Sequence, residues 1–75
     1  MEEGYILSNK FRRAIFDGLV SGETDIEYIA KKYRIILSVA RRIADDFING
    51  GILEKKGNKY VLTKEGEKLS NTIKG

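Results

Sequence analysis

More than half of the basic side chains in this sequence lie in two segments. Residues 31–42 (KKYRIILSVARR) carry five positive charges without an acid, and residues 55–59 (KKGNK) carry three more. Acids elsewhere reduce the formal net charge of the 75-residue chain to +3. Clustered cations attract the phosphate backbone of nucleic acids, so this distribution favours a nucleic-acid-binding protein. An ordinary solvated surface is the alternative.

The residues that most enzymes depend on are missing. The chain has no histidine and no cysteine, which removes the commonest general base, the commonest metal ligand and all thiolate chemistry. Asp45 and Asp46 are adjacent on an expected helix, so their carboxylates diverge and do not form an acid–base pair. We therefore expect no catalytic residues, no metal and no cofactor.

Composition indicates one small globular domain over residues 1–75, because 41% of the residues are hydrophobic and 33% are charged. No apolar run approaches the roughly 20 residues that cross a bilayer. The acidic start MEEGYILS differs from a basic signal peptide. We expect a cytoplasmic domain with no membrane partner.

Apolar residues at helical spacing predict two helices within residues 9–33. The first covers NKFRRAIFDGLVSG, opened by Ser8 or Asn9 and closed near Ser21-Gly22. The second is IEYIAKKY, capped by Thr24 or Asp25. Their stripes consist of Phe11, Ile15, Leu19, Ile26, Ile29, Ala30 and Tyr33.

A third helix follows a short turn at Arg34-Ile35 and runs roughly from Ile36 to Asn49. Gly50-Gly51 ends it, since glycine tolerates the left-handed backbone found after helices. The residues expected to face the core are Ala40, Ile43, Ala44 and Phe47.

The segment ILEKKGNKYVLT, residues 52–63, predicts a hairpin with a tight turn at Gly57-Asn58. Pairing outward from the turn sets Lys56 opposite Lys59, Lys55 opposite Tyr60, and Leu53 opposite Leu62. Like charges that face each other across a hairpin repel, so these lysines are better explained by an external anion. Thr63 is then the expected cap of a short C-terminal helix containing Leu69 and Ile73.

Three stretches between Leu7 and Leu69 carry a family resemblance. LSNKFRRAIFDGLVSGE is similar to an LSNPxRRxIL-type first helix, and IEYIAKKYRI is similar to a second helix and turn. FINGGILEKKGNKYVLTKEG is similar to the stretch from a recognition helix through a wing to an LTxxG helix start. The chain thus resembles the winged-helix DNA-binding domains of ArsR/MarR-like prokaryotic, in particular archaeal, transcriptional regulators.

The resemblance implies an α+β, mostly α, winged helix-turn-helix with a three-helix core, a short β-hairpin wing and a short C-terminal helix. It further implies that the third helix enters the major groove and that the wing lies along the flanking backbone of double-stranded DNA. This sequence departs from the family where Arg34 replaces a usual glycine and Ile36 replaces a capping Ser or Thr.

Loss of the cap costs about 1 kcal/mol and leaves backbone donors that a phosphate can meet. Alternatively, Ile36 and Leu37 form an apolar surface for a protein partner, or contact a thymine methyl group.

We expect the outward face of the third helix to read DNA, through Ser38, Arg41, Arg42 and Leu37. Phosphate contacts are expected from the second helix, the turn and the wing, namely Lys31, Lys32, Arg34, Lys55, Lys56, Asn58 and Lys59. In the alternative interpretation, Arg41 pairs with Asp45 and Arg42 with Asp46, at about 0.2–0.5 kcal/mol each.

Three functions stay open: a sequence-specific DNA-binding regulator, a protein-binding winged helix, and a non-specific nucleic-acid-binding protein. A monomer is as consistent with the sequence as a homodimer. A dimer contact would use Tyr5, Ile6, Leu7, Leu69 and Ile73.

Overall fold

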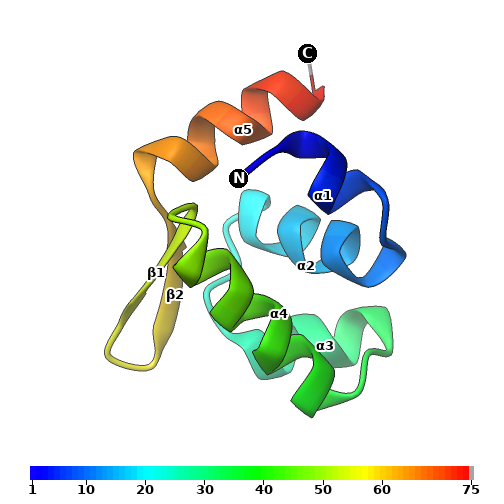
Figure 1. Cartoon of the computed structure of the whole chain (residues 1–75). Helices are drawn as coiled ribbons and strands as arrows, with labels where there is room; N and C mark the ends of the chain where they lie inside the picture. Colours follow the sequence, from blue (N-terminus) through cyan, green and yellow to red (C-terminus); the bar gives the residue numbers. More distant parts are fainter. Residues whose placement is uncertain (75) are drawn as a thin grey trace.

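The computed structural model describes residues 1–74, which form five helices and one antiparallel hairpin (Figure 1). The protein is thus a small α+β protein that is mostly helical, as the composition and periodicity predicted. The elements are α1 (Glu3–Leu7), α2 (Lys10–Val20), α3 (Ile26–Tyr33), α4 (Leu37–Asn49), β1 (Leu53–Lys56), β2 (Lys59–Leu62) and α5 (Lys64–Lys74).

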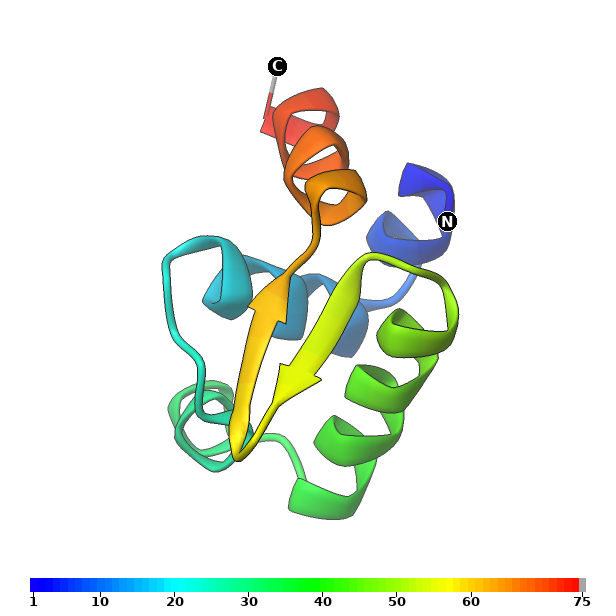
Figure 2. The same ribbon diagram turned by 90° about the vertical axis from the view of Figure 1, so that its left-hand side faces the viewer.

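Helices α2, α3 and α4 surround one core, and the hairpin closes its open side (Figure 2). Phe16 of α2 and Phe47 of α4 meet edge to face at its centre, with ring centroids 6.2 Å apart. The predicted apolar stripes point inward with two exceptions. Tyr33 is half-buried, and Phe11 is exposed, with the Lys10 ammonium 5.3 Å from the centroid of its ring.

Helices α2, α3 and α4 end in the same way, with one residue in the left-handed backbone region. In α2 and α4 this residue is a glycine, Gly22 (φ 102°) and Gly51 (φ 81°). In α3 it is Arg34, with φ 56° and ψ 46°. The N–H of Ile35 then donates to the carbonyl oxygen of Ala30 at 2.8 Å, which closes the end of α3. Arg34 thus holds a conformation that costs a residue with a Cβ about 1–2 kcal/mol.

The hairpin has the predicted register, with Leu53 opposite Leu62 and Lys56 opposite Lys59. Gly57 takes a positive φ of 62° at the turn, as a tight primed turn requires. The N–H of Tyr60 donates to the carbonyl oxygen of Thr24 at 2.9 Å, so β2 is also fastened to the loop before α3. This bond keeps the hairpin tip at the same end of the molecule as α3 (Figure 2).

Helix α5 starts directly after the hairpin and packs on its base. Thr63 caps the helix as predicted, since its Oγ1 accepts from the N–H of Gly66 at 3.2 Å. Gly66 itself lies against the hairpin stem, where a Cβ would overlap the carbonyl oxygen of Ile52. This close approach requires glycine at the first turn of α5.

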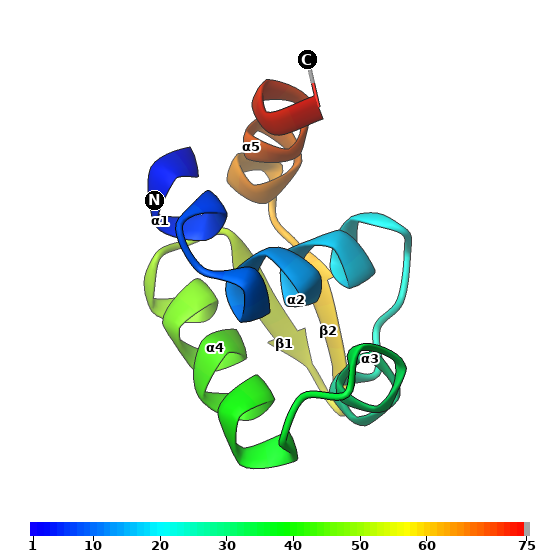
Figure 3. The ribbon, with the colours of Figure 1, turned by 90° about the vertical axis from the view of Figure 1, so that its right-hand side faces the viewer.

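Helix α1 was not predicted, and it lies beside α5 at the end of the molecule away from α3 (Figure 3). Its Ile6 is fully buried in the chain's own core, which makes Ile6 unavailable to the suggested dimer contact. The guanidinium of Arg12 lies 3.8 Å from the centroid of the Tyr5 ring, and Tyr5 Oη donates to Asp46 Oδ2 at 3.4 Å. Tyr5 therefore ties α1 to α2 and α4. Within the described chain, every helix is too short or too polar to cross a membrane.

Candidate nucleic-acid interface

Helix α4 divides cleanly into an inner and an outer face. Ala40, Ile43, Ala44 and Phe47 are buried, as predicted. Ser38, Arg41, Arg42 and Asp45 are exposed on the outer face, whereas Leu37 is half-buried and packs against the core. The polar residues expected to read DNA are thus accessible, but Leu37 presents little of its side chain.

The two arginines of α4 differ in what holds them. Arg41 Nη2 lies 3.2 Å from Glu27 Oε1 of α3, and both side chains are mostly exposed, at 57% and 63%. Arg42 has no carboxylate within 4.0 Å among the described residues. The alternative pairings of Arg41 with Asp45 and of Arg42 with Asp46 are therefore wrong. Arg41 instead reaches across to a neighbouring helix.

The lysines of the hairpin also have different surroundings. Lys56 Nζ is 3.4 Å from Glu54 Oε1 on the same strand, so it has a partner inside the hairpin that the sequence analysis did not assign. Lys55 Nζ lies 5.5 Å from the centroid of the Tyr60 ring opposite. Neither Lys55 nor Lys59 has a carboxylate within 4.0 Å in residues 1–74.

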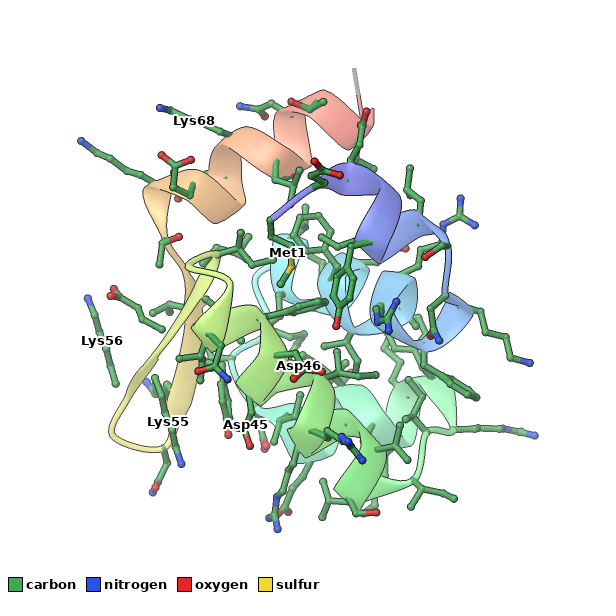
Figure 4. All side chains as sticks on the ribbon, in the orientation of Figure 1. Met1, Asp45, Asp46, Lys55, Lys56 and Lys68 are labelled. Carbon is green, nitrogen blue, oxygen red and sulfur yellow. The ribbon has the colours of Figure 1, made fainter. Side chains whose placement is uncertain are left out.

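A hollow lies between the start of α3, the middle of α4 and the hairpin tip, and charges of both signs surround it. Three of its lining residues are acidic and three are basic, namely Asp25, Glu27, Asp45, Arg41, Lys55 and Lys59. Asn58, at the turn, also lines it. Figure 4 shows Asp45 on the hairpin side of α4, where Lys55 also lies.

A second, smaller hollow lies between α3 and the start of α4. Lys31, Arg34 and Leu37 line it, together with Glu27, which lines both hollows. One surface therefore runs from the hairpin tip to the Arg34 turn with Glu27 near its centre. We call it the α3–α4–hairpin surface, and define it by the residues that line the two hollows. Ser38 and Arg42 are exposed on α4 but line neither hollow, so they lie outside this surface.

Lys32 does not line either hollow. It is five residues beyond Glu27, which places it about 140° around α3. Its ammonium lies 5.7 Å from the Tyr33 ring centroid instead. Lys31 is thus the α3 lysine of this surface. Sequence reasoning missed Glu27, although Glu27, Lys31 and Arg34 have the i, i+4, i+7 spacing of one helix face.

The start of α4 lacks a side-chain cap, as predicted from Ile36. The other helices longer than α1 each have one: Asn9 caps α2, Asp25 caps α3 and Thr63 caps α5. Ile36 is 72% exposed, more than any other large hydrophobic residue described. The start of α4 therefore combines uncapped backbone donors with an exposed apolar side chain.

A scan of protein-family models found no match to this chain, and a search of curated proteins found none either.

Proposed function

We propose that the protein is a winged helix-turn-helix that binds double-stranded DNA and regulates transcription. In this proposal α3 and α4 are the helix-turn-helix pair, α4 enters the major groove, and the hairpin is the wing on the flanking backbone. One observation carries the proposal. Six exposed basic side chains from α3, the turn, α4 and the hairpin have no carboxylate within 4.0 Å among the described residues: Lys31, Lys32, Arg34, Arg42, Lys55 and Lys59.

The dimensions of α4 suit this role. Its 13 residues extend over about 20 Å, and a major groove about 12 Å wide admits an α-helix. Arg42 lies in the middle of the exposed face, where a guanidinium can bind guanine or phosphate through two hydrogen bonds. Ser38 lies in the first turn and is short enough to allow close approach of the helix to base edges.

The phosphate contacts predict how binding responds to salt. About five contacts give a slope of log affinity against log salt near −4.5, which is a loss of several hundredfold between about 50 and 200 mM. Fluorescence anisotropy with a labelled mixed-sequence duplex measures this slope. A flat salt dependence, or no binding at about 50 mM salt, would contradict the proposal.

Competition distinguishes regulation from general DNA coating. Duplexes selected from a random pool should resist displacement by unrelated DNA if Ser38 and Arg42 read base edges. Equal displacement of selected and unselected duplexes would instead identify a non-specific nucleic-acid-binding protein.

A second candidate function rests on Ile36, because a 72% exposed isoleucine beside Leu37 is suited to an apolar protein partner. DNA binding by α4 and protein binding at Ile36 respond differently to Ile36→Ser. The substitution should leave DNA affinity unchanged within about twofold, whereas it should strongly weaken an apolar protein contact. Absence of salt-sensitive DNA binding would favour the protein partner.

A further inference from the structure

Glu27 is the one acidic residue that lines both hollows of the α3–α4–hairpin surface, among the described residues. It lines the hollow beside Lys55 and Lys59, and also the hollow beside Lys31 and Arg34. A DNA backbone that follows these lysines and arginines therefore has to pass close to the Glu27 carboxylate. Repulsion between this carboxylate and phosphate weakens the binding of every duplex, whatever its sequence.

The position of Glu27 is fixed by the fold. Its backbone N–H donates to Asp25 Oδ1 at 3.0 Å, which is the cap of α3, so Glu27 lies in the first turn of that helix. Helices α3 and α4 pack directly against each other. This packing brings Arg41 to Glu27 across 14 positions of sequence, with the 3.2 Å contact between Nη2 and Oε1.

The pair formed by Glu27 and Arg41 contributes little to the stability of the fold. Both side chains are more than half exposed, and exposed ion pairs add little to folding stability. The same pair has a larger consequence for binding, because a guanidinium bound to a carboxylate cannot at the same time make its best contacts with phosphate.

We propose that Glu27 is an intramolecular competitor that holds Arg41 away from DNA in the free protein and thereby limits non-specific binding. This role of Glu27 rests on the proposed function, because it limits the DNA binding proposed above. DNA has to displace the Glu27 carboxylate before Arg41 contributes, so an average duplex gains less from Arg41 than from Arg42. Asp25 and Asp45 line the same hollow and add to the repulsion.

The test compares Glu27→Gln with Glu65→Gln by anisotropy on a mixed-sequence duplex at about 50 to 200 mM salt. Glu65 pairs with Lys68 on α5, in an ion pair that is more exposed than that of Glu27, and Glu65→Gln changes net charge equally and away from the surface. Glu27→Gln should raise affinity roughly three- to tenfold over Glu65→Gln and steepen the salt slope by about 0.9.

A double-mutant cycle with Arg41→Gln separates competition for Arg41 from simple repulsion. If Glu27 acts by holding Arg41, the gain from Glu27→Gln should be about two- to fivefold smaller when Arg41 is already Gln. An equal or larger gain in that background would overturn the competition. Circular dichroism melting of every variant confirms that the folds compared are intact.

Failure of the two proposals gives different results. If the wild type does not bind DNA at about 50 mM salt, the proposed function fails and this inference fails with it. If the wild type binds with a steep salt slope but Glu27→Gln matches Glu65→Gln or binds more weakly, only the competitor role of Glu27 is overturned.

Discussion

At the scale of single residues, Arg34 is the clearest departure from what the backbone favours. The ends of α2 and α4 use Gly22 and Gly51 at the corresponding left-handed position, whereas α3 uses an arginine with φ 56°. A residue held in that region costs stability, so its side chain is the feature to test. The Arg34 side chain is exposed beside Lys31 on the α3–α4–hairpin surface.

Arg34→Asn removes the charge and keeps a residue that tolerates the left-handed conformation. We expect DNA affinity to fall about three- to fivefold and the salt slope to flatten by about 0.9. The free energy of unfolding in urea should not fall, because asparagine relieves part of the strain. Arg34→Lys keeps the charge and is the matched control. Unchanged DNA affinity of the Arg34→Asn variant would show that the turn is not part of the DNA interface.

Arg41 and Arg42 are neighbours in sequence but are expected to contribute unequally. Arg42→Gln removes a free guanidinium, so affinity for a mixed duplex should fall about three- to tenfold. Arg41→Gln should cost less, because Arg41 has to leave Glu27 before it contacts phosphate. Anisotropy titrations of both variants, with Lys68→Gln on α5 as the control for net charge, measure the difference. A larger loss for Arg41→Gln would contradict the assignment.

At the scale of elements, the start of α4 lacks a side-chain cap because Ile36 occupies the capping position. Ile36→Ser supplies the missing cap and should raise the free energy of unfolding by about 1 kcal/mol. Because Ile36 is 72% exposed, little buried apolar contact is lost. Urea denaturation measures the gain, and Ile36→Ala serves as the control that removes the isoleucine without adding a cap. Equal stability of the two variants would show that the cap is not formed.

The contact between α5 and the hairpin depends on Gly66. Gly66→Ala places a Cβ against the carbonyl oxygen of Ile52, so the free energy of unfolding should fall by about 1–3 kcal/mol. Helix propensity alone would predict a gain of about 1 kcal/mol. Gly4→Ala in α1 is the matched control, since no atom lies within 4 Å of the added Cβ. A stable Gly66→Ala variant would mean that α5 is not fixed against Ile52.

At the scale of the whole molecule, local patterns predicted the elements and missed the contacts between them. Periodicity located α2, α3, α4 and α5, and the Gly57-Asn58 turn fixed the hairpin register. Helix α1 was missed because five residues are too few to establish a helical period. Burial of Ile6 depends on contacts made by the folded chain, and no local pattern reports these.

Charge clustering predicted part of what lines the α3–α4–hairpin surface, namely Arg34, Arg41, Lys55 and Lys59, but not the acids Asp25, Glu27 and Asp45 beside them. In the alternative interpretation the i,i+4 rule paired Arg41 with Asp45, but tertiary packing of α3 on α4 supplied Glu27 as the partner instead. Lys31 and Lys32 are indistinguishable by charge, and only the orientation of α3 selects Lys31 for the surface. Charge clustering thus identified the elements involved, while helix orientation decided which cations and which acid meet.

The most direct test of DNA binding by α3, α4 and the hairpin is an amide-resolved NMR titration with a mixed-sequence duplex, at low and then at moderate salt. We predict that the shifted amides belong to Lys31, Arg34, Ser38, Arg42 and residues 55–59, and that these shifts fade as salt rises, whereas α1 and the end of α5 stay unchanged. Absence of shifts at low salt, or shifts centred on α1 and α5, would contradict DNA binding by α4 and the hairpin.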